Sequence, residues 1–432
     1  MPGGLLGALA LLLAAPAPAS DQPVLYGNAT LIDGTVRPNM DILVRGQRIV
    51  AVGPHGSLGG GPTRTVDLSG RFVIPGLIDS HVHLATPPDR PAAIEELKRD
   101  IYGGVTAVRS MADDTRAVAE LAREAETDEI AAPDIGFAAL MAGPPFFADP
   151  RVAAASRGWP PGTAPWMQAI DAKTDLRLAV ARAKGTGATA IKIYADLPPA
   201  LVAAIAREAH RQGLLVWAHS AVFPTRPAEV IAAGPDSVSH ACYLAYQVES
   251  VMLAAYEDHT PVHENLLSTP AGERTVAGLF AAMKVRDIVL DATGSLFVRA
   301  DRERREHPER RPLRCSGEAT ARLIADAYRA GVTLSAGTDY PGSDDWPSLH
   351  DELIFLVRDA HLPPLAAIRA ATLNGARAMG RDKDMGSIEP CKLANFVVLA
   401  KNPVAEIENI RSVTLTVRRG REFARGDYGE QK

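Results

Sequence analysis

The segment VIPGLIDSHVH, residues 73–83, is apolar and rich in β-branched side chains, and it ends in two histidines one residue apart. This pattern is typical of a buried β-strand. Side chains at positions i and i+2 of a strand point to the same side, so His81 and His83 can present two imidazoles to one metal ion. In barrel enzymes the catalytic residues lie at the carboxyl ends of the strands. The segment therefore predicts the first strand of a barrel that carries a metal site.

Strand and helix patterns alternate after this segment. Eight strand candidates cover residues 72–78, 104–109, 134–141, 189–194, 214–218, 235–239, 286–291 and 332–337. Helical patterns cover residues 94–102, 115–125, 175–184, 199–212, 320–330 and 350–360. Eight such repeats predict an α/β fold of the (β/α)8, TIM-barrel type. An open doubly wound sheet is the alternative, but its usual glycine-rich phosphate loop does not follow the first strand.

Short apolar strands separated by turns occupy both ends of the chain, and we expect them to pair into one small composite β-sandwich. The predicted organisation is a signal peptide (1–19), the first part of the sandwich (20–75), the barrel (76–384) and the second part of the sandwich (385–432). Residues 243–285 and 294–318 are expected to be long connections within the barrel. The arginine-rich part of the second, residues 299–314, is expected to be a solvated helix or loop, with a lid over the site as the alternative.

The composition is that of a globular protein, with 47% hydrophobic and 22% charged residues. A net charge of −5 gives no indication of a nucleic-acid-binding surface. Residues 5–15 form an apolar run that is too short to span a bilayer, and Ala17-x-Ala19 follows it. This pattern predicts a secretory signal peptide cut after Ala19, although no Lys or Arg precedes the run. We expect an exported protein, periplasmic or secreted, with a cytoplasmic location as the alternative.

The chain has three cysteines: Cys242, Cys315 and Cys391. An odd, sparse set is not typical of a disulfide framework. We expect all three to be small, buried apolar residues.

Side chains suited to metal binding or acid–base chemistry recur at or near the ends of five predicted strands. The set is His81, His83, Lys192, His219, His240 and Asp339. Imidazole and carboxylate groups suit Zn²⁺, and four His with one Asp exceed the needs of a single tetrahedral ion that keeps a position open for water. Two ions about 3.5–4 Å apart would use the whole set. Lys192 lies inside an apolar strand, where burial of an ammonium ion is costly.

The sequence resembles the amidohydrolase superfamily over nearly its whole length after residue 19. Its closest resemblance is to the imidazolonepropionase-like and Xaa-Pro dipeptidase-like metal-dependent hydrolases. The motifs that carry it are His81-x-His83, the strand Ile191-Lys192-Ile193, the helix end 209–213 before a strand that ends in His219, Gly337-Thr338-Asp339, the helix 371–376 and the β segment 386–399.

The resemblance implies a hydrolase that cleaves a carbon–nitrogen bond, amide or peptide, in a small substrate such as a dipeptide or an N-acyl amino acid. His81 and His83 would bind one Zn²⁺ ion, and His219 and His240 would bind the second. Lys192, carboxylated to a carbamate, would bridge the two ions. Asp339 would bind the first ion and act as general base on the bridging hydroxide. The expected partner is a small molecule, with no nucleic acid and no membrane after processing, and a homo-oligomer is left open.

Two alternatives remain at this point. A mononuclear deaminase or cyclic-amide hydrolase of the same fold would work without a bridging lysine, and Lys192 argues against it. A catalytically silent scaffold would have lost ligands, and the presence of all six residues argues against that. Ser239-His240-Ala241 stands where the family more often has Glu-His-Gly, and Cys391 and Asn395 replace a usual Gly and Asp. None of the departures is an expected ligand, so we expect a difference in the substrate pocket.

Overall fold

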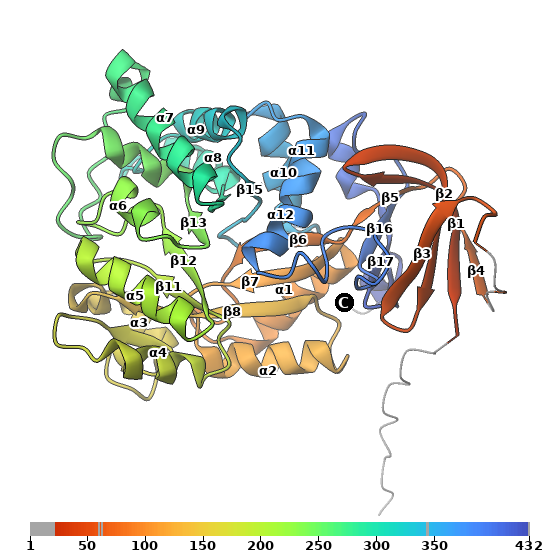
Figure 1. The fold of residues 1–432 in the computed structure, drawn as a ribbon, viewed down its shortest axis with the longest axis horizontal. Helices are drawn as coiled ribbons and strands as arrows, with labels where there is room; N and C mark the ends of the chain where they lie inside the picture. Colours follow the sequence, from red (N-terminus) through yellow and green to blue (C-terminus); the bar gives the residue numbers. More distant parts are fainter. Residues whose placement is uncertain (1–21, 59–60, 62–63, 343–344, 431–432) are drawn as a thin grey trace, which may run out of the picture.

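The computed structural model describes residues 22–58, 61, 64–342 and 345–430. The predicted signal peptide, residues 1–19, lies outside the described residues. The chain forms a barrel surrounded by helices, with a separate sheet at one side of it (Figure 1).

The barrel is built from eight parallel strands that pair in chain order. They are β6 (Leu77–Val82), β7 (Val105–Ser110), β8 (Asp134–Ala142), β11 (Ala190–Ile193), β12 (Leu215–His219), β13 (Ser237–Ser239), β14 (Val289–Asp291) and β15 (Leu334–Ser335). A short hairpin of β9 (Thr163–Ala164) and β10 (Met167–Ala169) lies beside β8. The Ser80 N–H donates to the Ala336 carbonyl, 2.9 Å away, which joins the first strand to the segment after the last. The predicted barrel is confirmed.

Helices cover the outside of the barrel (Figure 1). They are α1 (Arg90–Tyr102), α2 (Thr115–Glu126), α4 (Leu176–Lys184), α5 (Pro199–Arg211), α6 (Pro227–Ala232), α7 (Pro270–Val285), α8 (Gly294–Glu306), α9 (Gly317–Ala330), α10 (Ser348–Arg358), α11 (Pro364–Ala370) and α12 (Leu373–Ala378). Shorter helical segments are η1 (Pro144–Ala148), α3 (Pro150–Ala155), η2 (Ala241–Val248), η3 (Glu264–Ser268), η4 (Ile407–Arg411) and α13 (Asp427–Glu430). Within the described residues, no helix is both long and apolar enough to cross a membrane.

Residues 243–285 and 294–318 do connect barrel strands, and they contain helices for which no pattern was assigned: η2, η3, α7 and α8. On α7, Val276, Leu279, Phe280 and Met283 are buried at a spacing of three and four residues, which is the apolar stripe of a packed helix. The arginine-rich end of α8 is a solvated helix, which is the first of the two interpretations given above for residues 299–314. Arg299 on α8 pairs with Glu303 one turn later.

Strands from both ends of the chain pair into the separate sheet. Its order is β18 (Arg421–Ala424), β17 (Val413–Arg418), β16 (Phe396–Leu399), β5 (Phe72–Pro75), β1 (Val24–Asp33), β2 (Thr35–Arg45) and β3 (Arg48–Pro54), with β4 (Arg64–Asp67) beside β1. β5 runs antiparallel to β16 and so joins the two ends of the chain. The ring of Tyr26 packs edge-on against Phe396, with 4.9 Å between ring centroids. The prediction of a separate β unit built from both termini is confirmed.

The first predicted strand, residues 72–78, is in fact shared between the two units. β5 ends at Pro75 in the terminal sheet, and β6 begins at Leu77 in the barrel. Gly76 lies between them, and a Cβ at this position would overlap the side chain of Thr106. A continuous apolar sequence does not reveal this division, because both halves are buried.

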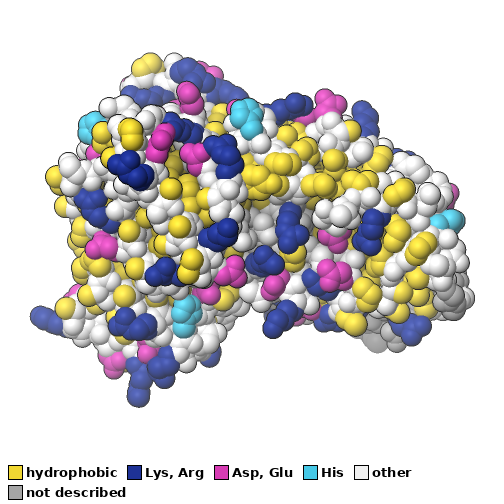
Figure 2. All heavy atoms as spheres, turned by 45° about the horizontal axis from the view of Figure 1, so that its top comes forward, with side chains coloured by type: hydrophobic (Ala, Val, Ile, Leu, Met, Phe, Trp, Pro, Cys, Tyr) yellow, Lys and Arg dark blue, Asp and Glu magenta, His cyan; other side chains and the backbone are white. Residues whose placement is uncertain are grey.

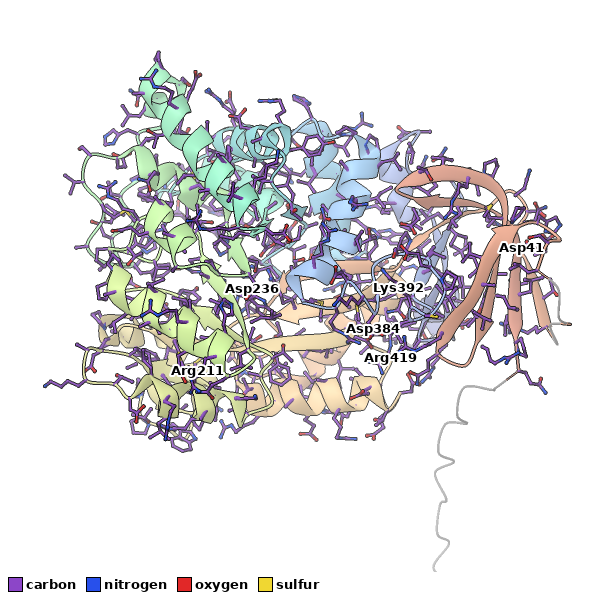
Figure 3. The ribbon with its side chains drawn as sticks, in the orientation of Figure 1. Asp41, Arg211, Asp236, Asp384, Lys392 and Arg419 are labelled. Carbon is purple, nitrogen blue, oxygen red and sulfur yellow. A yellow bond between two sulfur atoms is a disulfide. The ribbon has the colours of Figure 1, made fainter. Side chains whose placement is uncertain are left out.

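Ion pairs hold the terminal sheet against the barrel. Arg419, in the turn between β17 and β18, donates Nε–H to Asp134 at the start of β8 over 3.1 Å. Arg48 of β3 donates to Asp384 over 2.9 Å. Figure 3 shows Asp384, Lys392 and Arg419 gathered where the two units meet. Asn395, one of the departures noted above, accepts the Arg419 backbone N–H over 2.7 Å.

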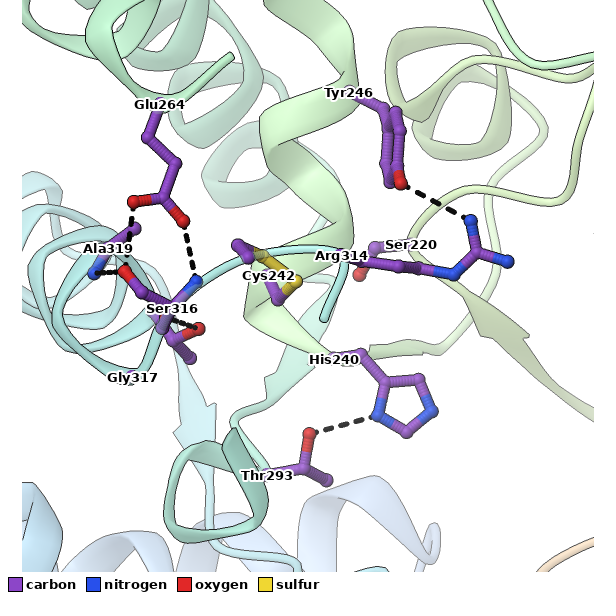
Figure 4. The surroundings of a disulfide bond; sticks show 12 residues. Ser220, His240, Cys242, Tyr246, Glu264, Thr293, Arg314, Ser316, Gly317 and Ala319 are labelled. Carbon is purple, nitrogen blue, oxygen red and sulfur yellow. Dashed lines mark hydrogen bonds between the residues drawn. A yellow bond between two sulfur atoms is a disulfide. The ribbon is translucent and has the colours of Figure 1, made fainter. Parts of the chain in front are cut away.

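Cys242 and Cys315 are buried, as expected, but the expectation for the cysteines was wrong in two other respects. Cys242 in η2 and Cys315 before α9 form a disulfide across a separation of 73 residues, with their Cα atoms 5.9 Å apart (Figure 4). Cys391 is exposed rather than buried. The pairing depends on the packing of η2 against α9, which brings together segments that are distant in the sequence.

Candidate active site

The barrel places all six predicted residues at or after the carboxyl ends of its strands. His81 lies in β6 and His83 follows it, Lys192 lies in β11, His219 ends β12, His240 follows β13, and Asp339 comes four residues after β15. Lys192 is fully buried, and its Nζ lies 3.4 Å from the Ser239 hydroxyl. No carboxylate of the described residues lies within ion-pair distance of that Nζ.

Asp339 contacts three of the four histidines. Its Oδ1 lies 3.0 Å from Nε2 of His83 and 3.4 Å from Nε2 of His81, and its Oδ2 lies 3.9 Å from Nδ1 of His240. His81, His240 and Asp339 can each offer one ligand atom within 4.8 Å of the others, so this group can hold a metal ion. His219 lies beside it, with its ring centroid 4.8 Å from that of His240.

Two of these residues have a left-handed backbone. The φ angle is +71° at His240 and +59° at Asp339. Non-glycine residues rarely adopt this conformation, and it persists where surrounding structure enforces it. The His240 N–H donates to the Asp291 carbonyl over 3.1 Å, and the Asp339 N–H donates to the His81 carbonyl over 2.8 Å. These bonds turn both side chains toward the centre of the site.

A second layer of polar residues, which sequence reasoning missed, orients the histidines. Asp291 at the end of β14 accepts a 2.8 Å hydrogen bond from Nδ1 of His81, and the buried Arg109 donates to the same oxygen over 3.2 Å. Thr293 lies 2.9 Å from Nδ1 of His240. Because Nδ1 of His81 carries the proton, its Nε2 has a free lone pair toward Asp339. Asp291 could have been found, since it ends the strand candidate 286–291.

Burial keeps two of the imidazoles neutral. It lowers the pKa of His219 well below the usual range and lowers the pKa of His240 to about 3. Burial also opposes the charge of His83, but hydrogen bonds to Asp113 and Asp339 outweigh it and raise the pKa of His83 to about 10. For Asp339, burial favours the neutral acid, but the interactions with His81 and His83 hold its pKa below the usual range.

The donor set fits a divalent metal ion. The neutral imidazoles of His219 and His240 and the ionised carboxylate of Asp339 are ligands of the kind that Zn²⁺ takes in catalytic sites. His83 would have to lose its proton when it binds a metal ion. Nδ1 of His219 is buried and has no hydrogen-bond partner among the described residues. A buried lone pair without a proton donor is costly, and a metal ion would satisfy it.

A cavity of about 240 Å³ opens directly over this group. His83, His219, His240 and Asp339 line one side of it, and aromatic rings line the other. A larger hollow of about 450 Å³ lies between α7 and α9, but none of the six residues lines it. The chemistry of the side chains therefore identifies the smaller cavity as the candidate active site.

The sequence profile of the Amidohydrolase family matches residues 72–423, which cover the barrel and most of the second terminal segment. The chain belongs to the Amidohydrolase family. It is a hydrolase that acts on carbon–nitrogen bonds, and its substrate is a small molecule.

Full-length relatives agree with this assignment. The imidazolonepropionase of Deinococcus radiodurans is 27% identical over 409 residues, which cover 90% of each chain. The fold is similar to that of a Xaa-Pro dipeptidase crystallised with methionine in the active site, with a TM-score of 0.73, 21% identity and coverage of 93% of this chain and 100% of that one. It is also similar to A. niger ochratoxinase, with a TM-score of 0.74, 21% identity and coverage of 94% and 96%.

Proposed function

We propose that this member of the family is a metal-dependent amidohydrolase that cleaves the amide or peptide bond of a dipeptide or an N-acyl amino acid. One observation carries the proposal: the Asp339 carboxylate contacts His81 and His83 and also lines the cavity. A group in that position can act on a bound substrate and on the metal ligands at once. Imidazolonepropionase-type hydrolysis is the second candidate, because the similarity to those enzymes spans the full chain.

In this proposal the six residues hold two divalent ions, for which Zn²⁺ is the best match to the donor set. When bound, the ions would polarise the scissile carbonyl and make water more acidic. Asp291 would keep Nε2 of His81 available as a donor, since it holds the proton on Nδ1.

Lys192 would be carboxylated. Burial lowers the pKa of Lys192 to about 7, so a large fraction of its side chain is a neutral amine at neutral pH. The nitrogen lone pair would add to the carbon of CO₂ and the nitrogen would lose one proton, which leaves a carbamate anion. The change replaces a costly buried cation with an anionic oxygen ligand among the histidines.

Asp339 would be the general base. It would accept a proton from the attacking water and deliver that proton to the departing nitrogen, which would otherwise leave as an unstable amide anion. Its depressed pKa keeps it ionised at neutral pH, which is the state that a general base requires.

The test is hydrolysis of a library of dipeptides and N-acyl amino acids by the zinc-loaded protein, with metal content measured in parallel. We expect about two ions per chain, and we expect Asp339→Asn to retain most of the metal while kcat falls about a hundredfold or more. Asp359→Asn, at an exposed position, is the matched control. Near wild-type kcat in Asp339→Asn would exclude Asp339 as the base, and an absence of bound metal would exclude the whole proposal.

We further propose that the protein is exported. The apolar run followed by Ala17-x-Ala19 supports this, and so does the Cys242–Cys315 disulfide, because disulfides persist mainly in oxidising compartments. N-terminal sequencing of the native protein should find a chain that begins near Ser20. An intact Met1 would overturn the proposal.

A further inference from the structure

The wall of the cavity opposite the histidines is aromatic. The ring of Tyr194 lies 4.5 Å from that of Phe146 and 5.5 Å from that of Tyr256, measured between centroids. Tyr194 also contacts the ligand candidate His219, with centroids 4.0 Å apart. The wall therefore combines apolar ring faces with hydroxyl groups, and it begins directly beside the proposed metal ligands.

One cation stands at this wall. Arg151 of α3 is the only Lys or Arg among the described residues that line the cavity. Asp149 engages one edge of its guanidinium, with contacts of 3.1 Å to Nε and 2.6 Å to Nη2. A guanidinium has five N–H donors, so donors remain for a second acceptor. The Arg151 side chain is 57% exposed and can be reached from the cavity mouth.

A second cation lies behind the wall. Arg314 is buried, and its guanidinium carbon lies 5.4 Å from the ring centroid of Tyr243 and 5.2 Å from that of Tyr256. Its hydrogen bonds go to a tyrosine hydroxyl and to backbone carbonyls, and no carboxylate of the described residues lies within ion-pair distance. Aromatic faces compensate this charge only in part, so the wall carries positive potential.

The disulfide positions this buried cation. Cys315 follows Arg314, and its partner Cys242 precedes Tyr243, so the bond holds the arginine against the tyrosine wall. Figure 4 shows Arg314 beside Tyr246 on the same side of the disulfide as His240.

We propose that this wall binds a carboxylate of the substrate, with Arg151 as the specificity-determining residue and Arg314 as a positioning residue behind the tyrosines. The substrate class would be amides that carry a carboxylate beside an apolar or aromatic group. This inference rests on the proposed function, because it names the substrate class of the same site. An anion at the wall would be attracted by both cations, and the attraction to Arg314 is screened less by solvent because that side chain is buried.

The test uses two ligands that cannot be hydrolysed. The zinc-loaded full chain is titrated calorimetrically with 3-phenylpropanoate and with 3-phenylpropan-1-ol, which differ in the carboxylate. We expect the wild type to bind the acid at least tenfold more tightly than the alcohol. Arg151→Gln should lose most of this preference, Arg151→Lys should keep part of it, and the exposed Arg157→Gln should keep all of it. Equal binding of the two ligands, or binding of neither, would overturn the proposal.

If the acid bound directly to the metal ions, Arg151→Gln would still bind the acid more tightly than the alcohol. That result would also overturn the proposal. Turnover of L-alanyl-L-phenylalanine and of L-alanyl-L-phenylalaninol separates this inference from the proposed function. If both are hydrolysed with equal kcat/KM, the function stands and the carboxylate site is wrong. If the Arg151-dependent binding preference is present without any hydrolysis, the site stands and the proposed function is wrong.

Discussion

Replacement of Lys192 by methionine should stabilise the metal-free protein while it removes the metal site. The lysine is fully buried between apolar strand residues, and its burial lowers its pKa from an ordinary 10.5 to about 7. Methionine has a similar length and no charge. A residue retained at a cost to stability is expected where function requires it.

The size of the effect follows from proton linkage. Between pH 7 and 10.5 the unfolded chain binds a proton on Lys192 that the folded chain does not, so the free energy of unfolding rises with pH across this window. The penalty on the folded state is about 4 kcal/mol at pH 7 and about 2 kcal/mol at pH 9. The methionine variant also loses the 3.4 Å hydrogen bond to Ser239, which reduces its gain in stability by about 1 kcal/mol. Lys192→Met should therefore gain about 3 kcal/mol at pH 7 and about 1 kcal/mol at pH 9.

The assay is urea unfolding and refolding of chelator-treated protein at both pH values, followed by tryptophan fluorescence. Lys173→Met is the matched control, since Lys173 is exposed, and it should change neither stability nor metal content. Zinc-supplemented Lys192→Met should bind less metal than the wild type. A variant that is less stable than the wild type at pH 7, or that gains as much at pH 9 as at pH 7, would refute the reasoning about the buried charge.

Three further predictions concern residues around the site and in the fold. Asp291→Asn should lower zinc affinity about 10- to 100-fold in a chelator competition, because an uncharged amide oxygen is a weaker acceptor for the Nδ1–H of His81; unchanged affinity would show that the charge of Asp291 does not support His81. Cys242→Ser with Cys315→Ser should lose about 4 kcal/mol of unfolding free energy in urea, from the 73-residue separation, whereas a loss no larger than that of the exposed Cys391→Ser would contradict this estimate. Burial lowers the pKa of His350 to about 3, so only the unfolded chain gains its proton as pH falls below 6.5. Between pH 6.5 and 5, the free energy of unfolding should therefore fall by about 2 kcal/mol less in His350→Gln than in the wild type. If the unfolding free energies of the two proteins depend on pH in parallel, this prediction is wrong.

The sequence by itself determined the barrel, a β unit formed by both ends of the chain and the six candidate site residues. It could do so because strand and helix periodicities are local, and because parallel barrel strands bring their carboxyl ends to one edge. A histidine or aspartate at the end of a strand candidate is therefore placed near the others without knowledge of any contact. His81, His219 and Asp339 were found in this way, although they are far apart in the chain.

Only the tertiary structure decided the contacts that no periodicity encodes. The bond between Asp291 and His81 joins β14 to β6, and the disulfide joins Cys242 to Cys315 across 73 residues. The division of the first strand at Gly76 depends on Thr106 in the neighbouring strand. The aromatic wall and its two arginines come from η1, α3, η2, the segments that follow β11 and η2, and the segment before α9. These segments are placed by side-chain packing between elements distant in sequence, and a local pattern carries no information about which of them will meet.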